Sequence, residues 1–123
     1  MNFVGFAAGL ATFLSIWLGH VAVRKIEFHA QVLWLPMGIF VALGLLIEYC
    51  SLITGNLLIK TVLGIVGFTL LFDAFELVRQ QRRIRTGHAP ANPQNPRHAA
   101  FLASANDQAT TIDMLKREPI TRY

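Results

Sequence analysis

Residues 3–23, FVGFAAGLATFLSIWLGHVAV, contain no charged side chain. As a helix they rise roughly 31 Å, which is enough to cross a hydrocarbon core of about 30 Å. The run is longer than the apolar segment of a usual signal peptide and no Lys or Arg precedes it, so we expect a transmembrane helix, with a cleaved leader as the alternative. The composition agrees, because 54% of the 123 residues are hydrophobic and only 15% are charged.

Two further apolar runs follow, at about residues 32–53 and 57–78, and the helix of the second is expected to continue beyond its boundary at Val78 through about Arg85. The first of these is long enough to span a membrane as a helix. The second run is less uniformly apolar, because Lys60 lies near one end and Asp73 and Glu76 lie near the other. Its ends must therefore lie at the membrane interfaces or against protein.

A short polar turn, Thr54-Gly55-Asn56, separates the last two runs, so we expect them to form an antiparallel hairpin. The predicted fold class is all-α, an integral membrane protein with three transmembrane helices and a cytoplasmic C-terminal tail. The three-helix domain covers residues 1–86, with helices at about 3–23, 32–53 and 57–85, and the tail covers residues 87–123.

The distribution of positive charge predicts the orientation. Residues 1–78 carry a net charge of −1, whereas residues 79–123 carry +5. Arg24 and Lys25 in the first connection fall on the same side of a three-span protein as the arginines after the third helix. The positive-inside rule places that side in the cytoplasm and the N-terminus outside. We therefore interpret the basic tail as a topology signal and expect no nucleic-acid partner.

The tail begins where Gly87 is expected to end the third helix. Proline then recurs at every third position from Pro90 to Pro96, which favours an extended, polyproline-like strut. Short helices are expected at about residues 99–105 and 111–118, and neither is long enough to be stable in isolation. We therefore expect a partner to hold the tail in place.

Small residues on the first and third helices indicate close packing against other helices. Gly5 and Gly9 form a GxxxG pattern, and further small residues continue roughly the same face of the first helix. The third helix has small residues on one side and a polar stripe on the other. The predicted helix-packing residues are Gly5, Gly9, Ser15, Gly19, Gly64 and Gly67.

Charged residues near the inner ends of the first and third helices are expected to form an interfacial cluster. Asp73 lies roughly 8 Å and Glu76 roughly 3 Å inside the predicted boundary, and two carboxylates there repel each other unless cations or a proton intervene. A proton or cation site that includes His20, and pairing with a neighbouring subunit, are the alternatives. The predicted cluster contains His20, Arg24, Lys25, Glu27, Asp73, Glu76 and Arg79.

A second charged pair is expected at the outer end of the hairpin. Folding the last two helices about Gly55 brings Glu48 level with Lys60. We predict an ion pair between these two side chains, with a structural role.

The sequence offers no recognisable catalytic or metal site. Cys50 is the only cysteine, which excludes an internal disulfide and a cysteine-based metal centre. His20 is the only histidine within an apolar run, so one copy of the chain does not supply the two axial ligands of a membrane haem. No Ser, Thr or Cys has a general base at a readable spacing. We predict no enzyme, no metal and no cofactor, with Trp17 as a candidate contact for a lipid or a quinone.

Several short motifs, in order, resemble a family of small bacterial membrane proteins known only as a domain of unknown function. Members of that family begin Met-Asn-Phe and end soon after a Gly-x-x-Pro-x-Asn-Pro motif. The resemblance covers about residues 1–97, departs at Val21 and His88, and implies a bacterial inner-membrane protein without an assigned reaction. It rests on Met1-Asn2-Phe3, the segment HVAVRKIEF at 20–28, Trp34, Gly64-x-x-Gly67, Leu71, Glu76-Leu77, Arg82-Arg83 and the segment GHAPANP at 87–93.

These features favour a non-catalytic accessory or scaffold subunit of a larger inner-membrane complex, respiratory or transport. Its partners would be other membrane-protein subunits, reached through the transmembrane helices and the tail, and the lipid bilayer. The alternative is a self-assembling pore or an ion or proton pathway of holin-like outline, lined by Asp73, Glu76 and His20. A third hypothesis is an adaptor whose basic segment, residues 79–85, binds anionic lipid.

Overall fold

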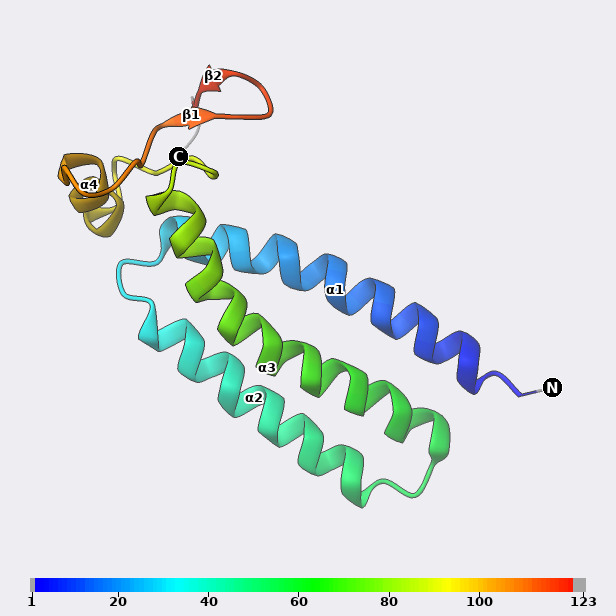
Figure 1. Ribbon diagram of the computed structural model, residues 1–123. Helices are drawn as coiled ribbons and strands as arrows, with labels where there is room; N and C mark the ends of the chain where they lie inside the picture. Colours follow the sequence, from blue (N-terminus) through cyan, green and yellow to red (C-terminus); the bar gives the residue numbers. More distant parts are fainter. Residues whose placement is uncertain (1, 121–123) are drawn as a thin grey trace.

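Three long helices make up most of the protein, shown in Figure 1 as a computed structural model that describes residues 2–120. Met1 and residues 121–123 lie outside the described part. Each long helix is long and apolar enough to cross a membrane, which confirms an all-α, multi-pass membrane protein. The helices are α1 (Val4–His29), α2 (Trp34–Ile53) and α3 (Leu57–Arg85).

The C-terminal segment adds a short helix and a small hairpin. The helix is α4 (Pro96–Ala103), and strands β1 (Ile112–Asp113) and β2 (Glu118–Pro119) pair antiparallel. Figure 1 shows this segment gathered over the ends of α1 and α3, at the far end of the molecule from the N-terminus.

Helix α3 is the central element of the bundle. It packs against both α1 and α2, which share few contacts with each other. Figure 1 shows α1 close to α3 near its C-terminal end and diverging from it toward the N-terminus. The buried residues of α1 agree with this arrangement, because Gly19, Val23 and Glu27 all lie in its second half.

The α2–α3 seam is built on glycines that let the two backbones approach closely. A Cβ atom at Gly44 would lie 2.8 Å from the Leu71 side chain, and one at Gly67 would lie 2.5 Å from Glu48 Oε1. Nearer the turn, the Ser51 hydroxyl donates a hydrogen bond of 2.9 Å to the Lys60 carbonyl oxygen. These contacts fix the register of the hairpin.

That register contradicts the predicted ion pair between Glu48 and Lys60. Glu48 lies opposite Gly67, seven residues or about 10 Å further along α3 than Lys60. Glu48 Oε1 is buried without a hydrogen-bond partner, and no ion pair joins the two side chains within residues 2–120. The prediction was wrong because the residue of α2 that reaches Lys60 is Ser51, about one turn nearer the loop than Glu48.

The predicted helix-packing glycines fall into two groups. Gly19 faces Asp73, and Gly64 lies against Ser51, so both form helix contacts within the chain. A Cβ atom at Gly5 or Gly9 would meet nothing within 4 Å. Ser15 lines a groove between α1 and α3.

The tail differs from its predicted conformation beyond the end of α3. Gly87 has a φ of 75° and follows the last residues of the helix, as predicted. The proline-containing segment then turns, with the Asn95 N–H donating to the Asn92 carbonyl oxygen at 3.0 Å, and is therefore no extended strut. Residues 112–119 form the β1–β2 hairpin instead of a helix.

The seam at Gly44 can be tested with a pair of alanine substitutions on the same helix. We expect Gly44→Ala to destabilise the protein by about 1–3 kcal/mol, because the added methyl group overlaps Leu71. Gly38→Ala is the control, since a Cβ atom there meets nothing within 4 Å and alanine favours the helix. Thermal unfolding in one detergent measures both. Equal stability of the two variants would contradict the close approach.

Candidate functional site

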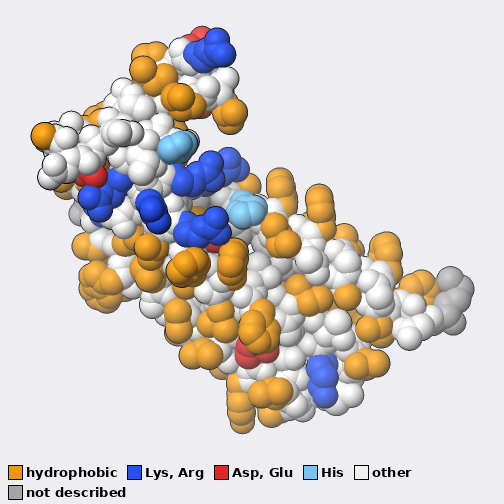
Figure 2. Space-filling view, in the orientation of Figure 1, with side chains coloured by type: hydrophobic (Ala, Val, Ile, Leu, Met, Phe, Trp, Pro, Cys, Tyr) orange, Lys and Arg blue, Asp and Glu red, His pale blue; other side chains and the backbone are white. Residues whose placement is uncertain are grey.

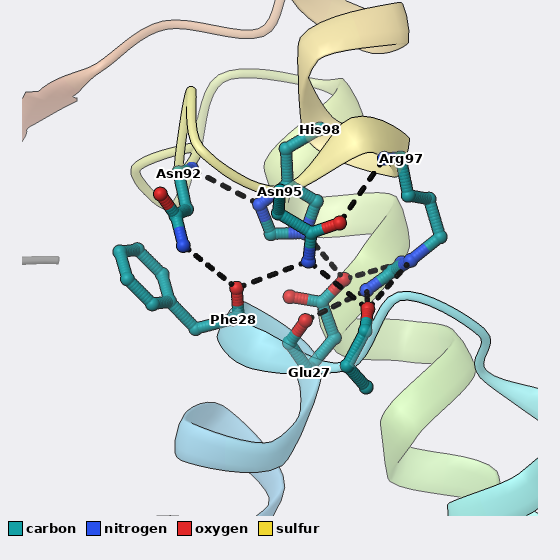
Figure 3. Close-up of polar contacts among 7 residues, drawn as sticks. Glu27, Phe28, Asn92, Asn95, Arg97 and His98 are labelled. Atoms are coloured by element: carbon teal, nitrogen blue, oxygen red, sulfur yellow. Dashed lines mark hydrogen bonds and ion pairs between the residues drawn. The ribbon is translucent and has the colours of Figure 1, made fainter.

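The C-terminal end of α1 is capped by side chains from the tail (Figure 3). The last carbonyl groups of a helix have no partner within it and must find donors elsewhere. Asn95 Nδ2 donates to the carbonyl oxygens of Phe28 at 3.1 Å and Ala30 at 3.0 Å, and Asn92 Nδ2 donates to Phe28 at 3.2 Å. The two asparagines therefore join segments more than 60 residues apart in the sequence.

Arg97 completes this cap and adds charge to it. Its guanidinium donates to the Glu27 carbonyl oxygen at 2.7 Å and to the Ala30 carbonyl oxygen at 3.2 Å. The same group pairs with the Glu27 carboxylate, with 2.7 Å between Nη1 and Oε1. A cation at this position also interacts favourably with the partial negative charge at the C-terminal end of a helix.

His98 lies next to the cap, and its hydrogen bonds determine which ring nitrogen carries the proton. Its Nδ1 accepts a hydrogen bond of 3.0 Å from the Asn92 backbone N–H. The neutral ring therefore carries its proton on Nε2, which lies 3.1 Å from Glu27 Oε1 and donates to it. Both side chains are fully buried, and Glu27 Oε2 has no hydrogen-bond partner in the part of the chain that the structure describes.

This arrangement removes Glu27 from the predicted inner charge cluster. Its partners are Arg97 and His98 of the tail. Sequence reasoning missed Asn92, Asn95, Arg97 and His98 as cap residues. The asparagines belong to the quoted GHAPANP motif and the residues directly after it, but the prolines favoured a strut.

Other members of the predicted cluster meet around a small cavity of about 260 Å³. Arg24 Nε donates to the His20 carbonyl oxygen at 3.2 Å, one turn earlier on α1. Glu76 is paired with Arg79, with 2.6 Å between Oε1 and Nη1. Lys25 lies apart from this cavity and lines a second one beneath the tail. The first cavity is lined by His20, Val23, Arg24, Glu76, Gln80 and Arg83.

Asp73 lies deeper in the bundle, between α1 and α3. Its side chain faces Gly19 and is 6% exposed. It lines two mostly apolar cavities of about 750 and 400 Å³, the larger of which also holds His20 and Thr69. An ionised carboxylate in such surroundings is costly unless a cation or donor faces it. Within residues 2–120 no hydrogen bond or ion pair involves its carboxylate.

No group of three or more His, Cys, Asp or Glu side chains within residues 2–120 has the arrangement needed to hold a metal ion. Trp17 lies exposed on the surface of α1. Cys50 is a free thiol of intermediate exposure. The polar chemistry of the described chain is therefore concentrated at the cap and around Asp73.

These features define a small three-helix membrane protein whose first helix is capped by its own C-terminal segment. A family model described as "Domain of unknown function (DUF4491)" matches residues 2–95, and the chain belongs to this family. The match includes Glu27, Asn92 and Asn95, whereas Arg97 and His98 follow it. The chain matches no curated protein and no solved structure.

The cap can be tested by removing donors without changing side-chain size. Asn95→Asp keeps the oxygen that accepts from the Arg97 N–H at the start of α4 but replaces the amide donor with a second oxygen. We expect the free energy of tail docking to be about 2 kcal/mol less favourable, because the second carboxylate oxygen then faces two carbonyl oxygens. Asn106→Asp, at an exposed position, is the control.

Amide hydrogen exchange of residues 96–103 measures the docking. Faster exchange in Asn95→Asp and unchanged exchange in Asn106→Asp are expected. Identical exchange in the two variants would show that the cap does not hold the tail.

Proposed function

We propose that this protein is a non-catalytic accessory or scaffold subunit of a larger complex in the bacterial inner membrane. The observation that carries the proposal is the first half of α1, which has no buried residue between Val4 and Leu18. In a bilayer an exposed apolar side chain needs no protein partner, but a face of small residues favours close approach of another helix. Gly5 and Gly9 offer such a face, and a Cβ atom at either would meet nothing within 4 Å among the described residues.

The distribution of charge supports an orientation for this subunit. Arg24, Lys25 and the arginines at the end of α3 lie at the same end of the bundle as the tail. The positive-inside rule assigns that end to the cytoplasm and the N-terminus to the outside. In this orientation the first half of α1 recruits its partner within the outer half of the bilayer.

The direct test is gentle detergent extraction of the tagged protein from its own membranes, followed by native mass measurement. The expected result is a defined hetero-complex in which other membrane proteins are present in fixed ratio. Recovery of a monomer or a homo-oligomer alone would contradict an accessory role.

A substitution in the small-residue face sharpens this test. Gly9→Leu is expected to abolish stoichiometric co-purification, because the leucine side chain prevents close helix approach. Gly38→Leu is the matched control, since this glycine of α2 is also open and lies outside that face. Both variants should insert and unfold like the wild type, because a Cβ atom at either position meets nothing within 4 Å among residues 2–120. Equal co-purification with Gly9→Leu and Gly38→Leu would count against α1 as the interface.

A second candidate function is an ion or proton pathway in a self-assembled pore. The observation that favours it is Asp73, a buried carboxylate that lines two cavities within the predicted membrane span and has His20 beside one of them. Ionisable residues at such depth often mark ion or proton pathways.

Liposome flux distinguishes this pathway from a structural role of the carboxylate. If Asp73 carries ions or protons, Asp73→Asn should reduce flux by about tenfold or more while the variant remains folded. Asp107→Asn, which also removes one negative charge but lies in the tail, should leave flux unaltered. Absence of flux from the wild type, or wild-type flux from Asp73→Asn, would refute the pathway.

A further inference from the structure

A cavity of about 460 Å³ lies where the ends of α1 and α3 meet the tail. Its wall combines residues of α1, α3, the connection after α3 and the β1–β2 hairpin. Figure 2 shows this side of the molecule, with Lys and Arg side chains gathered between the helices and the tail and histidines at their edges. The tail thus adds a wall to an open cavity at the two helix ends.

The cavity presents uncompensated positive charge. Arg24, Lys25 and Arg83 line it, and none of them forms an ion pair within residues 2–120. One carboxylate, Asp113, also lines it and accepts a hydrogen bond of 2.9 Å from the Leu115 N–H. The charge facing the cavity is therefore positive by two units with histidine neutral.

The neighbouring arginines are not equivalent to these three cations. Arg79 is paired with Glu76, Arg85 with Asp107 and Arg97 with Glu27. The basic segment of α3 therefore does not act as one patch, because only some of its cations are available to an anion in this cavity.

Gln80 adds a neutral hydrogen-bonding group to the wall. This residue is 9% exposed and lines both this cavity and the adjoining one of about 260 Å³. No hydrogen bond to its amide occurs within residues 2–120. The amide is therefore available to a ligand. An oxygen-rich ligand in the cavity would accept the hydrogen bonds that this amide can donate.

The position and lining of the cavity indicate the class of ligand. Arg24 is the first charged residue of α1, and Gln80 lies two residues beyond the end of the apolar part of α3, so the site lies where headgroup phosphates meet the protein. Apolar side chains of Phe28, Ile84 and Met114 share the wall with the cations. A phosphate with an attached glycerol or acyl portion satisfies both parts of this lining.

We propose that this cavity is a binding site for a phosphate monoester or diester, with Arg24, Lys25 and Arg83 pairing with the phosphate and Gln80 donating to it. An anionic phospholipid headgroup and a soluble phosphate ester share this chemistry. Arg and Lys are the usual partners of phosphate oxygens, and Arg bonds two of them at once.

Native mass spectrometry of the purified full-length protein in detergent tests the site. The protein is titrated with phosphatidylglycerol, with phosphatidylcholine as the uncharged comparison, and with glycerol phosphate as the soluble form. The matched pair is Arg83→Gln and Arg82→Gln, because the two arginines are adjacent, exposed and unpaired, but only Arg83 lines this cavity.

Phosphatidylglycerol should bind the wild type and Arg82→Gln alike, and should bind Arg83→Gln about fivefold more weakly. Gln80→Leu should also weaken binding, although it leaves the net charge unchanged. Retention of phosphatidylglycerol without glycerol phosphate would identify a lipid headgroup as the ligand, and equal binding of both would identify the phosphate ester alone as sufficient. Either result supports the site.

Three outcomes would overturn the proposal. The first is equal binding of phosphatidylglycerol and phosphatidylcholine by the wild type. The second is equal loss in Arg82→Gln and Arg83→Gln, which diffuse attraction to a basic surface predicts. The third is unchanged binding in Gln80→Leu. Thermal unfolding of each variant confirms that a loss of binding is not a loss of fold.

Discussion

The carbonyl groups at the end of α1 impose the constraint on which the C-terminal half of the structure depends. A helix that leaves the bilayer must find donors for its last carbonyl oxygens, and here the donors come from Asn92, Asn95 and Arg97. Once they are in place, Glu27 becomes fully buried and acquires Arg97 and His98 as partners. The end of the first helix thus provides a docking surface for the tail within the same chain.

The spans were predictable because burial in lipid demands a long apolar run, and such a run is a local property of the sequence. The register of the α2–α3 hairpin could not be predicted from the sequence. This register depends on which side chain packs against each glycine, with Leu71 against Gly44 and Glu48 against Gly67. Counting from the turn placed Glu48 level with Lys60, whereas its side chain lies against Gly67 and Ser51 reaches Lys60. The length of α1 was also underestimated, because its last six residues, 24–29, are polar or mixed and are held by the distant tail.

The candidate site shows the same division between local and distant information. The cations near the helix ends could be named from the sequence, but their roles could not. Arg79 and Arg97 resemble Arg24 and Arg83 in the printed chain, yet the first two are paired and the last two are not. The prolines of the tail predicted a strut because their spacing is local, whereas the asparagine contacts that bend this segment span more than 60 residues.

The cap also has a mechanical consequence. Helix α1 is held by the tail at its C-terminal end and diverges from α3 toward its N-terminal end. Any tilt of this helix would therefore be centred on the cap. Its 26 residues extend about 39 Å. A tilt of about 10° around the cap would carry the first turn roughly 7 Å sideways. A small displacement at Glu27 and Arg97 would therefore be larger at the N-terminal end of the helix.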